Sequence, residues 1–122
     1  MHEYVHAVLT TLPVAVPSWF HEGLAQHFEA RRPPPATRLA RLGVVTPDAL
    51  QTPFARLPTD VVPAAYATAH ALVVRLVERR GQWGLHQLVA ELKSGRDFAD
   101  AFQRTFAVTV DELYREVASS PP

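Results

Sequence analysis

The 122-residue chain contains no cysteine, so disulfides and thiolate metal ligands are excluded, and any metal ion must be held by histidine and carboxylate side chains. Charge of one sign is also missing, because twelve basic residues balance twelve acidic ones. That neutrality argues against a nucleic-acid partner and against a polybasic patch for a membrane surface. No apolar run approaches the length of a transmembrane helix, so we expect no membrane span in this chain.

A convincing alternation of apolar and polar residues, as in a half-buried strand, is absent too. Apolar residues recur instead at helical spacing, and the chain length suits one domain. We therefore predict a mainly α fold, with one domain over residues 1–119 and a tail over 120–122. The predicted helices span about residues 1–11, 18–30, 64–80, 83–93, 97–105 and 109–119.

Local signals set the ends of these helices. Ser18 is predicted to cap the helix over 18–30, and Gly81 to stop the helix over 64–80. Residues 109–112, Thr-Val-Asp-Glu, form a capping box for the last helix. The proline-rich stretch 32–62 is the least regular part, with only a short capped helix predicted over residues 46–51.

Residues 2–6, His-Glu-Tyr-Val-His, form an HExxH sequence. On a helix, residues four positions apart lie about 40° apart around the axis, so His2 and His6 can bind one metal ion. Glu3 lies about 100° from His2, which suits a base acting on a metal-bound water better than a ligand. The alternative is a surface helix that carries two histidines by chance.

A third ligand is needed, because a catalytic zinc ion takes three protein ligands and one water. Glu22 is the candidate, in the segment 19–25, Trp-Phe-His-Glu-Gly-Leu-Ala. The proline-bracketed turn before it allows the first two helices to pack antiparallel. Gln26, one turn later, is predicted to orient a ligating imidazole. His21 points about 100° away from Glu22, which indicates a surface position or one behind the ligands.

The two motifs together resemble those of the peptidase MA-like family of gluzincins, thermolysin-related zinc metallopeptidases that combine HExxH with a later W-x-x-E-G-L-A helix. A tyrosine-bearing helix that ends in a glycine, here over residues 65–81, also resembles the family. So does the closing pair of helices over 98–113. The resemblance covers nearly the whole chain except residues 32–62.

The resemblance implies one Zn²⁺ per chain, bound by His2, His6 and Glu22, with Glu3 as the general base of peptide-bond hydrolysis. Zincin peptidases place a β-sheet before the HExxH helix, and its edge strand binds the substrate. We therefore expect this chain to be the helical C-terminal part of a zincin-like domain, without the upstream sheet and within a longer polypeptide. The implied partner is a peptide or protein substrate.

Aromatic side chains supply the remaining candidates. Tyr66 is the candidate donor to the oxyanion of the tetrahedral intermediate, with His70 second. An amphipathic core tyrosine is the alternative interpretation of Tyr66. Trp19 and Trp83 are predicted to be packing residues.

Two other functions stay open at the level of sequence. A zinc-binding but catalytically inactive interaction module is the first, although an intact Glu3 argues against it. A helical interaction domain with a fortuitous motif is the second, and the presence of both Glu3 and Glu22 argues against that. Proteins of this kind are often exported by bacteria, so an exported or cell-envelope parent is compatible with the composition.

Overall fold

The computed structural model describes residues 2–29 and 35–119, and the side chains of residues 5–29 and 38–119. These residues are mainly helical and include no strand, which confirms the predicted mainly α class. None of their helices is both long enough and apolar enough to cross a membrane. The elements are α1 (His2–Thr10), α2 (Ser18–His27), α3 (Pro35–Leu42), α4 (Pro47–Gln51), the 3-10 helix η1 (Phe54–Arg56), α5 (Val62–Lys93), α6 (Phe98–Phe106) and α7 (Val110–Ser119).

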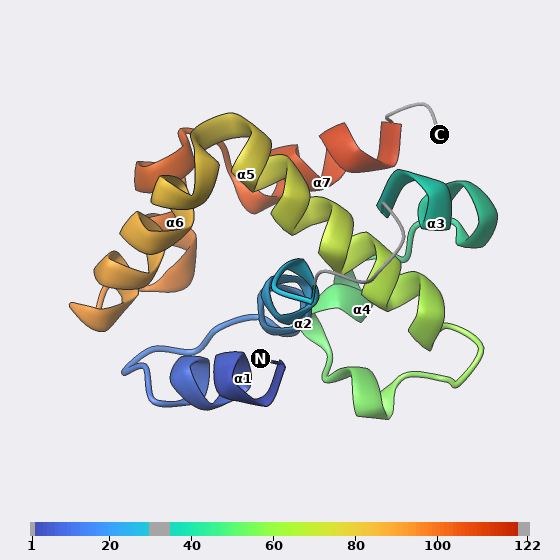
Figure 1. Cartoon of the computed structure of the whole chain (residues 1–122), viewed down its shortest axis with the longest axis horizontal. Helices are drawn as coiled ribbons and strands as arrows, with labels where there is room; N and C mark the ends of the chain where they lie inside the picture. The colour runs from blue at the N-terminus through green and yellow to red at the C-terminus, as the bar shows by residue number, and fades with distance from the viewer. Residues whose placement is uncertain (1, 30–34, 120–122) are drawn as a thin grey trace.

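The long helix α5 runs through the molecule, most of the other elements pack around it, and α1 packs on α2 (Figure 1). Its axis changes direction at Gly81, where φ is 66° and ψ is −173°. Glycine adopts this backbone conformation at far lower cost than other residues. The predicted helix end at Gly81 is therefore confirmed as a kink, and the helix starts at Val62, two residues before the predicted start.

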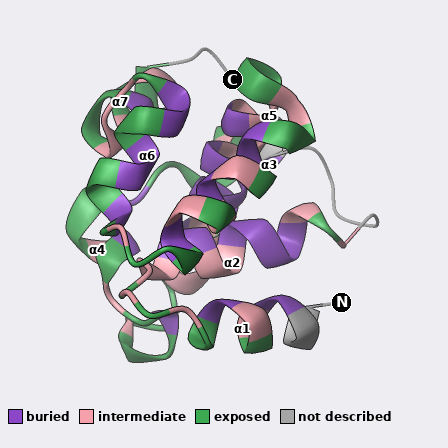
Figure 2. Cartoon of the chain, turned by 90° about the vertical axis from the view of Figure 1, so that its left-hand side faces the viewer, coloured by how far each residue is buried: buried purple, intermediate pink, exposed green. Residues whose placement is uncertain are grey.

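Helix α2 lies across the first half of α5 and forms the most extensive contact in the fold. Figure 2 shows that most of α2 is buried between its neighbours. Trp19 and Phe20 are fully buried, and Trp19 contacts Phe98 and Phe102 of α6 edge to face. The packing role predicted for Trp19 is thereby confirmed. Gly23 sits at the crossing point, where no side chain fits against α5.

Both C-terminal helices are capped at their first turn, and the capping box of the last one is as predicted. The side chain of Asp97 accepts a hydrogen bond from the Asp100 N–H at the start of α6. At the start of α7, Thr109 and Glu112 exchange both bonds of the predicted capping box, at 2.9 and 3.1 Å. Trp83 departs from its prediction: 74% of its surface is exposed, since it lies on the outer side of α5 just after the kink.

The proline-rich region is more regular than its sequence indicates. Helix α3 begins at Pro35, a position that proline tolerates because the first helical N–H has no partner within the helix. The short helix α4 is as predicted, capped by Thr46, whose side chain accepts a bond from the Ala49 N–H. The cap predicted for α2 is wrong, because α2 starts at Ser18 itself and the Ser18 hydroxyl donates to Gln51 O at 3.4 Å.

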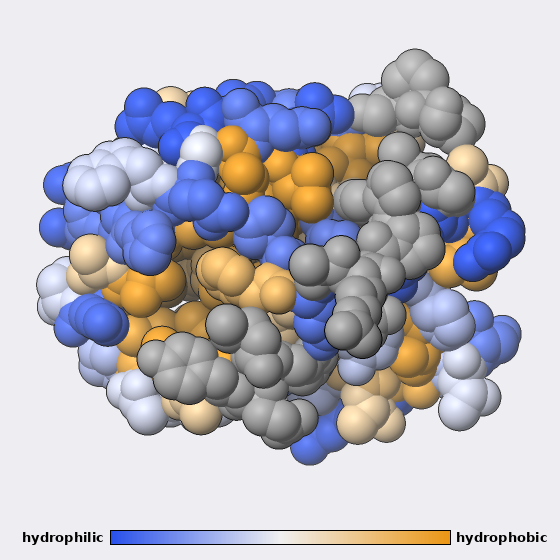
Figure 3. Space-filling model, viewed as in Figure 1, coloured by the Kyte–Doolittle hydropathy of each residue, from blue (hydrophilic) through white to orange (hydrophobic). Residues whose placement is uncertain are grey.

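The surface carries both hydrophilic and apolar residues. In Figure 3 apolar residues gather in the middle of the displayed face and hydrophilic residues border them. Among described residues, the large apolar side chains with substantial exposure are Phe28, Leu42, Val44 and Trp83. Leu42 and Val44 lie close together at the end of α3 and just after it, whereas Phe28 follows α2 and Trp83 belongs to the second half of α5.

Candidate metal centre

The candidate centre lies where α1 packs on α2. Val5 and Leu9 of α1 are buried, with 6% and 3% of their surfaces exposed. His6 follows Val5 on the helix and is partly buried. The proline-bracketed turn over residues 11–17 brings α2 back against α1, as the sequence predicts, so His6 faces residues of α2.

His6 and Glu22 meet across this helix pair. His6 Nε2 lies 3.1 Å from Glu22 Oε1, and 26% and 17% of the two side chains are exposed. Two zinc bonds of about 2.1 Å at the tetrahedral angle would separate their donor atoms by about 3.4 Å. The observed separation is close to that value, and it also suits a direct hydrogen bond. The pair therefore fits two positions of a zinc coordination shell.

His21 contacts the other side of the His6 ring. The two Nδ1 atoms are 3.3 Å apart, the ring planes differ by 12°, and the ring centroids are 5.4 Å apart. Burial, and then the neighbouring His6, lower the pKa of His21, which favours its neutral form. Helical geometry places His21 about 100° from Glu22 around α2. The imidazole of His6 nevertheless contacts both residues, because each of its two nitrogens faces one of them.

His2 and Glu3 belong to α1, but their side chains lie outside the described part of the structure. Among the side chains that are described, no group of three or more His, Asp or Glu residues could hold a metal ion. His2, the expected third donor, is not among these side chains. The roles of His2 as a ligand and of Glu3 as a base therefore stay predictions.

Gln26 has a different role from the predicted one. Its side chain is fully buried, and its Nε2 donates to the carbonyl oxygens of Tyr66 at 2.8 Å and of Glu22 at 3.3 Å. Its Oε1 accepts a bond from Arg38 at 3.0 Å. The amide thus joins α2, α3 and α5 beneath the candidate centre, and these bonds do not orient an imidazole.

Tyr66 and His70 lie one turn apart in the first half of α5. The Tyr66 ring packs edge to face on Phe54, with centroids 5.1 Å apart, and is partly buried. His70 is almost completely buried. These contacts agree with a packing role for Tyr66, while a role for either residue at an oxyanion stays a prediction.

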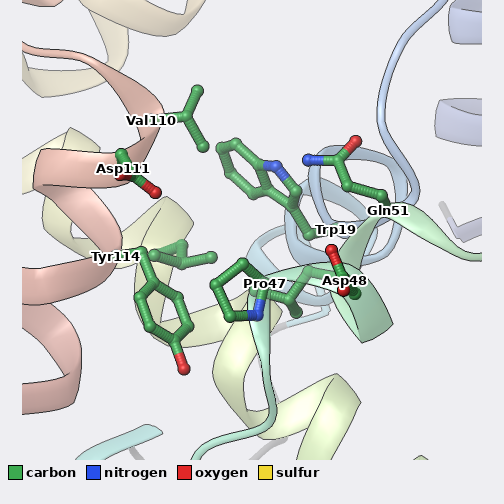
Figure 4. A pocket seen from close by; sticks show the side chains of 9 residues that line it. Trp19, Pro47, Asp48, Gln51, Val110, Asp111 and Tyr114 are labelled. Atoms are coloured by element: carbon green, nitrogen blue, oxygen red, sulfur yellow. The ribbon is translucent and has the colours of Figure 1, made fainter.

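A hollow of about 210 Å³ lies on another part of the molecule, between α2, α4, α5 and α7. Trp19, Asp48, Gln51, Asp111 and Tyr114 contribute to its lining (Figure 4). The buried indole Nε1 of Trp19 has no hydrogen-bond partner among the described residues. Neither His6 nor Glu22 lines this hollow, so it is separate from the candidate metal centre.

Comparisons with models of known protein families, with curated proteins and with solved structures give no match to this chain.

Proposed function

We propose that the chain is the zinc-binding and catalytic core of a metallopeptidase, with His2, His6 and Glu22 as ligands of one Zn²⁺ and Glu3 as the general base. The observation that carries the proposal is the 3.1 Å approach of His6 Nε2 to Glu22 Oε1. These atoms belong to different helices, and two separate sequence motifs predict both residues as ligands of the same ion.

The position of His2 in α1 supports its proposed role as the third zinc ligand. The helix begins at His2, so His2 and His6 stand four residues apart on a continuous helix. Side chains with this spacing lie on one face of the helix. We therefore expect His2 to lie on the same face of α1 as His6, which is the face that packs against Glu22. Zinc with these three ligands keeps one position open for water.

The proposed reaction is hydrolysis of a peptide bond in a peptide or protein substrate. Zinc, when bound, lowers the pKa of a water ligand to about 7 and polarises the substrate carbonyl. Glu3 accepts the proton of the attacking water and delivers it to the leaving amine. Tyr66, or His70 in its place, donates a hydrogen bond to the oxyanion of the tetrahedral intermediate.

Zinc stoichiometry tests the ligand set. After dialysis against zinc and removal of the free ion, elemental analysis of the intact chain is expected to give one zinc per chain. Glu22→Ala removes a ligand and is expected to lose the ion. Glu78→Ala, which removes an exposed carboxylate from α5, is the matched control and should keep it. A folded wild-type chain without zinc, or full zinc content in Glu22→Ala, would overturn the proposal.

Hydrolysis tests the role of the base. Glu3→Gln keeps the shape of the side chain but cannot accept the proton of the water, so we expect zinc content to persist and cleavage of unfolded casein to stop. Retained cleavage in this variant would remove Glu3 from the mechanism. A wild-type chain that binds zinc and cleaves nothing would instead identify an inactive zinc-binding module.

A further inference from the structure

Both ring nitrogens of His6 face side chains of α2. Nε2 lies 3.1 Å from Glu22 Oε1, and Nδ1 lies 3.3 Å from His21 Nδ1. The two imidazole planes are within 12° of parallel, and the nitrogens are closer together than the 5.4 Å between the ring centroids. The rings thus present their Nδ1 edges to each other, as an N–H···N bond requires.

We infer that His21 is a positioning residue of the metal centre: it accepts a hydrogen bond from Nδ1 of His6 and so keeps Nε2 of His6 unprotonated for the metal ion. The inference rests on the proposed function. Ligating histidines generally donate their second ring N–H to a carboxylate, a carbonyl or a water. In this chain the acceptor is a second imidazole, supplied by the residue that precedes the ligand Glu22.

The positions of the protons follow from the requirement for one donor and one acceptor. A neutral imidazole carries its proton on one nitrogen only. When Nε2 of His6 binds a metal ion, its proton must lie on Nδ1, so His6 donates and His21 accepts. The proton of His21 then lies on Nε2.

Without metal, the hydrogen bond between the two rings has the opposite direction, with His21 as donor and His6 as acceptor. An ionised Glu22 is an acceptor only, so the contact at 3.1 Å requires a proton on Nε2 of His6. His6 Nδ1 is then the acceptor, and His21 donates from its own Nδ1. Metal binding therefore reverses the N–H···N bond and exchanges the tautomers of both rings. This exchange is a signature that a merely structural role of His21 would not produce.

Zinc affinity of side-chain variants gives the first test, measured on the intact chain by competition with a coloured chelator. In His21→Leu the Nδ1–H of His6 loses its acceptor, and we expect zinc affinity to fall about 10- to 100-fold. In His21→Asn the amide oxygen can take the place of the imidazole nitrogen, so affinity should return to within a few-fold of wild type. His86→Leu, which removes an exposed histidine from α5, is the matched control.

The outcomes separate this inference from the proposed function. Equal zinc affinity in wild type and folded His21→Leu would overturn the inference and leave the zinc site in place. An affinity loss in His21→Asn as large as in His21→Leu would also overturn it, since restoring an acceptor would then have no effect. A folded wild-type chain that binds no zinc would overturn both.

Nitrogen-15 NMR of the histidine rings gives the second test and needs no enzyme activity. At about pH 8.5, where unperturbed imidazoles are neutral, the metal-free chain should show His6 protonated on Nε2 and His21 on Nδ1. Zinc should shift both protons to the other nitrogen of each ring. Unchanged tautomers of His21 on zinc binding would contradict the inference.

Discussion

Replacement of Gly23 by alanine adds a methyl group where α2 crosses α5. An ideal Cβ at this position would lie 2.3 Å from the carbonyl oxygen of Ala69 and 2.7 Å from Cγ2 of Val73. Carbon–oxygen contacts in proteins are normally about 3.3 Å or longer. The nearest obstacle is backbone, which cannot turn aside as a side chain can, so α2 and α5 would have to separate by about 1 Å.

Two opposing effects set the size of the change. Alanine is favoured over glycine in a helix by up to about 1 kcal/mol. Overpacking of a dense core costs about 1–3 kcal/mol, and a contact with backbone at 2.3 Å belongs at the upper end of that range. We therefore expect Gly23→Ala to lower the free energy of unfolding by about 2 kcal/mol, which corresponds to roughly 8 °C in Tm.

Urea denaturation monitored by circular dichroism measures this loss. Gly84→Ala is the matched control, because its added methyl also meets close neighbours, but at the contact of α5 with Phe106 of α6. Both variants should be less stable than wild type. Only Gly23→Ala should also weaken zinc, because it moves the helix that carries Glu22. A Gly23→Ala chain as stable as wild type would refute the close approach of α2 to α5.

Two other predictions concern interactions away from the metal centre. Gln26→Met keeps the volume of the side chain but removes the bonds to Arg38 and to the Tyr66 carbonyl, so we expect a loss of about 2–4 kcal/mol; an unchanged urea midpoint would contradict it. Hydrogen bonds from the backbone and then the side chain of Thr109 lower the pKa of Glu112. A group whose pKa is lowered in the folded state stabilises the protein at pH values above its unfolded pKa. That stabilisation is lost as the pH falls through the folded-state pKa. Glu112→Gln should therefore destabilise the chain more at pH 7 than at about pH 2, and equal effects in urea titrations at both pH values would disprove the argument.

The helix ends that could be predicted from the sequence depend on local chemistry. Gly81 was predicted to stop a helix and lies at a kink with positive φ, where glycine avoids a steric cost. The capping box of Thr109 and Glu112 needs only residues three positions apart, and the structure contains both of its bonds. Such signals need no knowledge of the rest of the fold, so sequence alone is enough to find them.

The features that the sequence does not predict depend on contacts between residues far apart in the chain. Helix α3 was missed because its prolines indicated a loop, while the buried Arg38 within it bonds to Gln26 on another helix. The surroundings of His21 were not foreseen, because helical angles compare residues on one helix and its partner His6 lies on another. For the candidate site, the two sequence motifs correctly predict that His6 lies near Glu22. They do not predict that His21 contacts the other nitrogen of the His6 ring.

Helix α1 packs extensively against only one other element among the described residues, α2. Val5 and Leu9 bury the apolar surface that holds α1 on α2. Such a segment can detach at a lower free energy than the rest of the core, as a separate unit of local unfolding. An ion held between α1 and α2 binds only the attached state, and at 100 times its Kd it would favour that state by about 2.7 kcal/mol. Metal supply would then control how long the first helix stays docked, independently of the stability of the helices around α5.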